Sequence, residues 1–375
     1  MSERDPIEEL SALFLVLADI DFAGYSPLYE SLARAIATDR DLLAAIDEAA
    51  LPNSRRGRVP VLFFAATHDL ALAHPESRLA VIFRGESSDD VVSAFRELVD
   101  ANWPTLVATM RSHSVQTNEV GRSAVLVPAF WRVLSHANSS ATPILFEIGP
   151  SAGLNLFADL FAIEYTRDQS LVAVVGPSES AVQLHCELRG PHTPALPPTL
   201  ASPAIRAGID PNPIDVTSPE ECRWLQACLW PGNPERLERL RGALRIAQLA
   251  PPLLTQGDAV ADLSKSLEAL PNGASLIIFS TWALAYINAE GRNRVAEAID
   301  SLGRTRDLAF LTFEEPRFTP WITDYDMNLF DRYHGEGTPT VLGLRSWSEG
   351  TCTSKALAIG HPHGRWLHWL EENHG

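Results

Sequence analysis

The sequence has few cysteines, no long apolar run and fewer basic than acidic residues, and each shortage excludes a class of protein. The four cysteines, Cys186, Cys222, Cys228 and Cys352, form no CxxC pair and have no histidines at zinc-finger spacing. Neither a metal site nor a disulfide framework is therefore predicted. No apolar run reaches the roughly 18 residues that span a bilayer, and the first residues, MSERDPIEEL, lack the order of a signal peptide. We expect a cytoplasmic protein that makes no membrane contact.

The shortage of basic residues argues against a nucleic-acid partner. Thirty Lys and Arg against 47 Asp and Glu give a formal net charge of −17, and such a surface repels a phosphate backbone. Hydrophobic residues make up 46% and charged residues 21% of the 375 residues, which is typical of a globular protein. This length favours a main domain with a substantial accessory part.

The first third of the chain is predicted to be helical. From residue 8 to about 136, apolar residues recur at helical spacing, for example in SPLYESLARAIA and DDVVSAFRELVDANWPTLVATM. The polar stretch SHANSSATP follows. We predict a helical N-terminal domain over residues 1–140, serving as a lid or substrate domain, and a second domain over residues 141–375.

After Pro143 short apolar runs alternate with helical segments, which indicates an α/β fold with a mostly parallel sheet. An insertion at about 165–203, which holds LVAVVG and VQLHCELRG, is predicted to form an extra β-hairpin. The last two of seven main runs are close enough for an antiparallel hairpin. The predicted strands lie at 144–149, 204–210, 253–258, 275–280, 308–314, 340–347 and 354–361.

The segment ILFEIGPSAGLNLFADLFA carries the strongest functional signal. An apolar strand runs into Glu147, a glycine turn and a predicted amphipathic helix, whose first N–H groups would face a ligand over the turn. The pattern E-x-G-x-x-x-G-x-N, from Glu147 through Gly149 and Gly153 to Asn155, resembles the first motif of class I S-adenosylmethionine-dependent methyltransferases. Ser151 stands where a middle glycine is often found there. The resemblance implies a Rossmann-like, seven-stranded methyltransferase fold and S-adenosyl-L-methionine as cofactor.

Two other interpretations of the same turn remain open. Residues 149–153 also spell G-x-S-x-G, the nucleophile elbow of serine hydrolases, with Ser151 as nucleophile. A hydrolase elbow normally follows several strands, whereas the preceding segments are predicted helices, so we favour the cofactor turn. The turn also suits a glycine contact between helix and strand, or a non-catalytic nucleotide- or cofactor-binding protein.

Acidic residues follow two further strands, and ligands of open parallel sheets lie beyond the carboxyl ends of the strands. Asp210 closes the predicted second strand and is a candidate for the ribose hydroxyls, with Glu187 as the alternative for another strand order. Asp258 resembles the acid that such methyltransferases place near the adenine amino group. Solvated loop residues are the alternative for each.

The ends of the fourth and fifth predicted strands supply the remaining candidates. Ser280 and Thr281 are predicted to contact the cofactor, with Trp282 at the substrate and Tyr286 beside the reacting methyl group, although core packing would also explain both rings. A hydroxyl acceptor would need a general base, for which His113 and Glu314 are candidates; a carboxylate acceptor would need none.

A polar cluster at 116–122 precedes an otherwise apolar helix. Arg122 is predicted one helical turn from Asn118 and on the same face. Helix capping explains Thr117 or Asn118 and explains Arg122 less well. We therefore predict a substrate-binding cluster of Asn118, Glu119 and Arg122, in which Arg122 is available for a carboxylate.

Several of these segments together resemble a bacterial family catalogued as domain of unknown function 2332. They are SPLYESLA, QTNEVGR, FEIGPSAGLNL, GIDPNPIDV, RWLQACLWP and QGDAVADL. The family's fourth strand tends to end in a histidine-bearing segment, where this chain has Phe279, Ser280 and Thr281. We expect a methyltransferase that acts on oxygen or nitrogen of a small molecule, without a metal, and the oligomeric state is not predicted.

Overall fold

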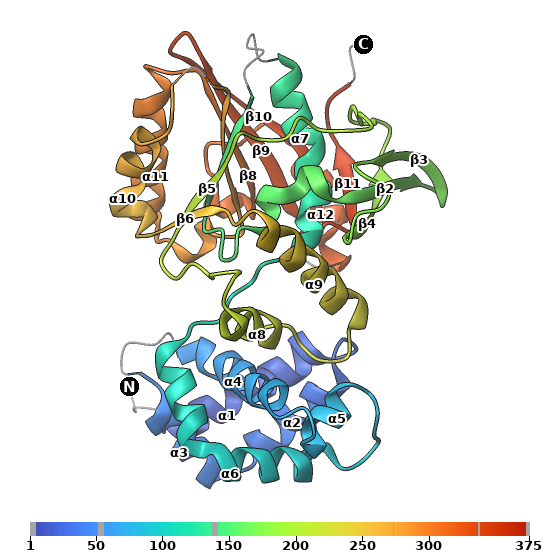
Figure 1. Cartoon of the computed structure of the whole chain (residues 1–375), viewed down its shortest axis with the longest axis vertical. Coiled ribbons are helices and arrows are strands. Elements are labelled where there is room, and N and C mark those ends of the chain that lie inside the picture. Colours follow the sequence, from blue (N-terminus) through green and yellow to red (C-terminus); the bar gives the residue numbers. More distant parts are fainter. Residues whose placement is uncertain (1–4, 52–55, 137–141, 273, 337, 373–375) are drawn as a thin grey trace. The chain divides into compact units, whose positions relative to one another are not determined.

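The computed structural model describes residues 5–51, 56–136, 142–272, 274–336 and 338–372 (Figure 1). It divides into two compact units. The first runs to Thr117 and includes Ser218–Glu238, whereas the second comprises Asn118–Thr217 and the chain from Arg239 onward. The domain boundary predicted at 140/141 falls on residues 137–141, outside the described ranges. None of the helices within those ranges has the length and apolarity needed to cross a membrane.

The first unit is helical, which confirms the prediction for this part of the chain. Helix α4 is mostly apolar and almost wholly buried, as expected for a helix surrounded by others. The ring of Tyr29 stacks on Phe64 with centroids 4.5 Å apart. The helices are α1 (Pro6–Val16), the π-helix η1 (Leu17–Phe22), α2 (Pro27–Ala37), α3 (Arg40–Ala49), the 3-10 helix η2 (Arg56–Arg58), α4 (Val59–Ala73), α5 (Arg78–Phe83), α6 (Val91–Ser112) and α8 (Pro219–Ala227).

Helix α8 belongs to the first unit although it lies about 100 residues further along the chain. Trp224 is buried and its Nε1 donates to the Ser114 carbonyl at 3.1 Å. Arg223 forms a 2.8 Å ion pair with Asp69 of α4. The ring of His68 is bonded to the carbonyls at the end of α8, and burial lowers its pKa to about 4. The contacts of His68 and Asp69 attach α8 to α4, and that of Trp224 attaches it to the segment after α6. The following helix, α9 (Pro234–Leu249), spans the division between the units.

The second unit is built on one large mixed sheet of eleven strands within the described ranges. The strand order is β3-β2-β4-β11-β10-β9-β8-β7-β1-β5-β6. The strands are β1 (Ile144–Ile148), β2 (Ala162–Arg167), β3 (Ser170–Val175), β4 (Gln183–Arg189), β5 (Ile205–Asp210), β6 (Leu253–Gln256), β7 (Leu276–Thr281), β8 (Leu308–Glu314), β9 (Thr340–Ser348), β10 (Thr351–Gly360) and β11 (Trp366–Trp369).

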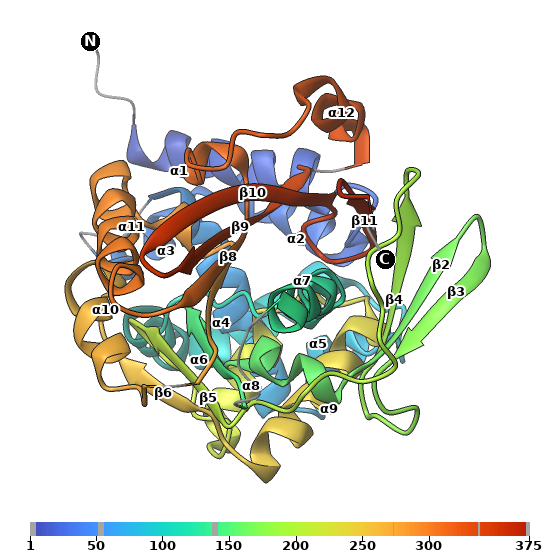
Figure 2. The ribbon, with the colours of Figure 1, turned by 90° about the horizontal axis from the view of Figure 1, so that it is seen from above.

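Helices cover both faces of the central strands (Figure 2). β1, β7 and β8 are buried along their whole length, as is typical of parallel strands. Ile278 packs in one core with residues of α10 and α11, whereas the next residue, Phe279, contacts Phe130 of α7 on the opposite face. The helical segments of this unit are η3 (Val120–Arg122), α7 (Ser123–His136), η4 (Leu154–Leu160), α10 (Ala259–Glu268), η5 (Leu284–Tyr286), α11 (Ala289–Gly303), η6 (Pro316–Phe318), α12 (Met327–Arg332) and η7 (His334–Glu336).

The mixed α/β architecture and the antiparallel β9–β10 hairpin are confirmed, but the prediction of seven strands is wrong. The residues expected to continue a helix after the glycine turn bend at Phe157 and enter β2. The expected hairpin of β3 with β4 does not form: β3 pairs with β2, and β4 pairs in parallel with β2 and β11. The insertion thus extends the main sheet.

Candidate functional site

The turn after β1 lies at the carboxyl end of the parallel strands. Three of its residues have left-handed backbone, namely Gly149 (φ 72°), Ser151 (φ 53°) and Gly153 (φ 68°). The Gly153 N–H donates to the Pro150 carbonyl at 2.7 Å and closes the turn. The amphipathic α-helix predicted to follow is instead the seven-residue 3-10 helix η4. The prediction that the dipole of an α-helix contributes to ligand binding at this turn therefore no longer applies.

The glycines of this region are required by close packing. A Cβ on Gly149 would lie 2.4 Å from the Cβ of Ala283, and one on Gly208 of β5 would lie 2.6 Å from the Glu147 carbonyl oxygen. Ala283 thus fills the space at the Gly149 Cα that the sequence pattern assigns to a ligand. A ligand at this turn would contact the side that carries the Glu147 and Ser151 side chains.

Asp210, at the end of β5, anchors the turn. Its Oδ2 accepts the Ser151 N–H at 2.9 Å and its Oδ1 accepts the Asn212 N–H at 2.8 Å. The negative charge of Asp210 is therefore held by backbone donors, as in other anion-binding turns. Glu187 lies on β4 and pairs with Arg189. Asp210 ends β5, the strand that pairs with β1, and is therefore the acid next to the turn.

Glu147 is a buried carboxyl group at the end of β1, with 2% of its surface exposed. Burial raises its pKa well above the ordinary value, and the nearby charge of Asp210 adds to the rise. The positive charge of Arg122 and a hydrogen bond with Asn155 act in the opposite direction. Asn155 is in turn fixed by Ser123 of α7, whose hydroxyl donates to its Oδ1 at 2.9 Å.

Three buried polar atoms around the turn have no hydrogen-bond partner among the described residues: Asn118 Oδ1, Glu147 Oε2 and Ser151 Oγ. Asn118 is held against the turn because its Nδ2 donates to the Pro150 carbonyl at 3.0 Å. An unpaired buried polar group costs about 1–3 kcal/mol. Their grouping at one turn indicates a place where a ligand with hydrogen-bond donors would complete the structure.

The prediction that Arg122 and Asn118 share a helix face is wrong, because α7 begins only at Ser123. Arg122 ends the 3-10 turn η3 and is 5% exposed. Its Nη1 donates to the Thr281 carbonyl at 3.0 Å and its Nε to the Pro362 carbonyl at 3.1 Å. The guanidinium thus connects the end of β7 to the loop between β10 and β11.

That loop, residues 361–365, was not singled out by the sequence patterns. His363 Nδ1 lies 2.9 Å from Glu119 Oε2, and Gly364 packs so closely on Gly121 that a Cβ on Gly364 would lie within contact distance of the Gly121 carbonyl. His361 is buried, and burial together with neighbouring positive charges lowers its pKa to about 3. The sequence HPHG at residues 361–364, which places two histidines beside a proline and a glycine, could have indicated this loop.

Glu314 holds the segment after β7 in place. Its Oε1 accepts three hydrogen bonds, from Ser280 Oγ at 2.8 Å, the Ala283 N–H at 2.9 Å and the Leu284 N–H at 3.1 Å. Burial raises its pKa to about 7, and its Oε2 has no hydrogen-bond partner within the ranges that the structure describes. Trp282, predicted at the substrate, has left-handed backbone (φ 56°), and its Nε1 donates to Thr340 Oγ1 at 3.3 Å.

Three predicted residues remain, namely Asp258, Tyr286 and His113. Asp258 is exposed and caps α10, accepting the Val260 N–H at 2.8 Å. Tyr286 ends η5 and is 47% exposed. His113 belongs to the first unit, where its ring contacts that of Trp224. The structure therefore groups Asn118, Glu119, Arg122, Glu147, Gly149, Ser151, Gly153, Asn155, Asp210, Ser280, Thr281, Trp282 and Glu314 at one edge of the sheet.

A protein-family model matches most of the chain. The model of a family described as "Uncharacterized protein conserved in bacteria (DUF2332)" matches residues 11–369. A search of the curated proteins finds no match.

Proposed function

We propose that this chain, which belongs to this uncharacterised bacterial family, is an S-adenosylmethionine-dependent methyltransferase. The proposal rests on the geometry of the second unit. The cofactor would bind at the carboxyl edge of the second unit, and the acceptor would be a small molecule. The observation that carries the proposal is the group of unpartnered buried atoms at the turn after β1: Asn118 Oδ1, Glu147 Oε2 and Ser151 Oγ.

The strand order supports a Rossmann-like assignment. The five parallel strands β6-β5-β1-β7-β8 are, in chain order, strands 3-2-1-4-5. This is the order of doubly wound nucleotide-binding sheets, which bind ligands where the order reverses. The reversal here falls between β1 and β7, beside Glu147 and Ser280.

The polar atoms at the turn fit a cation with N–H and O–H donors. When bound, S-adenosylmethionine supplies a methyl group on a positively charged sulfur. Glu147 would accept a hydrogen bond from the ammonium group, while Asn118 Oδ1 and Ser151 Oγ would accept from further donors. Arg122, fixed by two carbonyls, keeps Thr281 in position. Catalysis would rest on positioning and exclusion of water.

Calorimetric titration with S-adenosylmethionine and S-adenosylhomocysteine tests the proposal. Glu147→Gln should weaken binding of both about tenfold or more, because a charge-assisted hydrogen bond contributes about 1.5–3 kcal/mol. Glu187→Gln, on the half-exposed β4 acid, is the matched control and should bind normally. No saturable binding by the parent protein would remove the cofactor proposal. Binding with no methyl transfer in an acceptor screen would favour a binding protein.

A serine hydrolase is the second candidate, because Ser151 has the strained left-handed backbone expected of a nucleophile elbow. However, its Oγ is shielded from solvent and bonded to no base among the described residues. Ser151→Ala separates the two functions. Hydrolysis of p-nitrophenyl acetate that disappears in this variant would favour the hydrolase, whereas the methyltransferase should lose only one hydrogen bond to its cofactor.

A further inference from the structure

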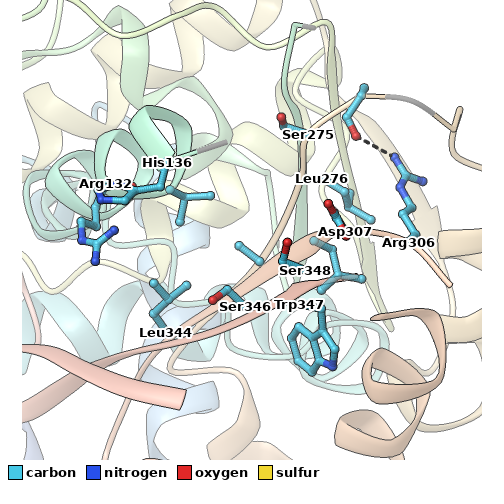
Figure 3. A pocket seen from close by; sticks show the side chains of 14 residues that line it. Arg132, His136, Ser275, Leu276, Arg306, Asp307, Leu344, Ser346, Trp347 and Ser348 are labelled. Carbon is cyan, nitrogen blue, oxygen red and sulfur yellow. Dashed lines mark hydrogen bonds between the residues drawn. The ribbon is translucent and has the colours of Figure 1, made fainter. Parts of the chain in front are cut away.

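A cavity of about 480 Å³ lies in the second unit at the amino-terminal ends of β7 and β8, the edge opposite the turn after β1 (Figure 3). This volume is within the range of about 300–1,000 Å³ that is common for small-molecule sites. Arg132 and His136 of α7 lie on one side of it in Figure 3, and Ser275 and Arg306 lie on the other.

The lining combines an apolar body with a polar rim. Val133, Ala309 and Leu344 contribute apolar surface, and the hydroxyl-bearing Ser275 and Ser348 lie at the strand ends. Small-molecule sites are typically lined in this way, with a few polar groups that orient the ligand.

Arginines outnumber acidic residues in the lining, unlike in the chain as a whole. The protein carries a formal net charge of −17, yet the cavity is lined by Arg132 and Arg306 with Asp307 as its acidic residue. The carboxylate of Asp307 already has a partner within the protein, since its Oδ1 accepts the Glu349 N–H at 2.9 Å. Arg132 pairs with Glu371 at 3.0 Å, which leaves Arg306 as the cation to consider.

Arg306 forms no ion pair within the described part of the chain. Its Nη2 donates to the Ala274 carbonyl at 3.3 Å, the dashed line in Figure 3, and its Nε is shielded from solvent without a partner. A guanidinium has five N–H donors and suits carboxylate and phosphate oxygens. We propose that this cavity binds a small organic anion, whose anionic oxygens contact Arg306 and whose apolar body contacts Val133 and Leu344.

Titration of the full chain with naphthalene-2-carboxylate, naphthalene-2-methanol and 2-naphthyl phosphate tests this proposal. We expect saturable binding of at least one anion, at least tenfold tighter than the alcohol. The preferred anion distinguishes a carboxylate ligand from a phosphate ester. Arg306→Gln should weaken anion binding about tenfold or more. Arg304→Gln, an exposed arginine two residues away that does not line the cavity, is the matched control and should bind as the parent does.

Val133→Phe places a ring in the cavity and tests where the anions bind, without changing any charged residue. It should abolish binding of the anions and leave any titration with S-adenosylmethionine unchanged. Alcohol binding as tight as anion binding, or no saturable binding of either anion, would overturn the proposal. Full affinity in Val133→Phe would show that the anions bind elsewhere and would overturn it equally.

Discussion

Replacing Glu314 by glutamine should change how the stability of the protein depends on pH. Burial raises the pKa of Glu314 from its ordinary 4.5 to about 7, so between these values the folded state holds a proton that the unfolded state has lost. Stability therefore falls as pH rises through this window and levels off above 7. The full effect is about 3 kcal/mol, most of which falls between pH 5 and 8.

In Glu314→Gln the amide oxygen can accept the three hydrogen bonds that Glu314 Oε1 accepts. The amide nitrogen takes the place of Oε2, which has no partner among the described residues. Urea unfolding of both proteins at pH 5, 6, 7 and 8 measures the effect. The difference in unfolding free energy should shift by about 2–3 kcal/mol in favour of the variant from pH 5 to pH 8. Glu290→Gln, at a carboxylate 76% exposed, should show no such shift. Parallel pH profiles for Glu314→Gln and the parent would refute the burial argument.

Three further outcomes follow from the packing and from the buried charges. Gly149→Ala should destabilise the second unit by about 2 kcal/mol or more through its left-handed backbone and the Ala283 contact; adding Ala283→Gly should recover part of this in a denaturation cycle. Trp224→Ala should cost about 3–5 kcal/mol, measured by urea unfolding, because the ring is buried. If Glu147 binds a cation, calorimetry should show affinity rising with pH and proton release on binding, because the cation favours the ionised carboxylate whose pKa burial has raised.

The central strands could be predicted from the sequence because the apolar pattern that identifies each strand lies within that strand. β1, β7 and β8 are mainly apolar runs with no competing helical periodicity, and each has a polar residue at or next to its last position that marks the carboxyl edge. This is why Glu147, Ser280 and Glu314 were predicted to lie at one edge, where the structure brings Ser280 and Glu314 into direct contact.

The remaining features depend on contacts between distant segments. β2 and β4 form because they pair with each other and, through β11, with the main sheet, and no local pattern in the insertion specifies that pairing. The pairing of Glu119 with His363 joins residues 244 positions apart. The role of Asp210 was likewise hidden, because a carboxylate that binds backbone N–H groups has the same sequence pattern as one that binds ribose.

The return of residues 218–238 to the first unit has a consequence for how the protein is made. The chain passes from one unit to the other after residues 117, 217 and 238. When the first 117 residues leave the ribosome, α4 still lacks the helix that carries Trp224 and the partner of Asp69. The amino-terminal unit therefore cannot reach its final packing until most of the polypeptide has been translated, and during that interval its hydrophobic surface is available to chaperones.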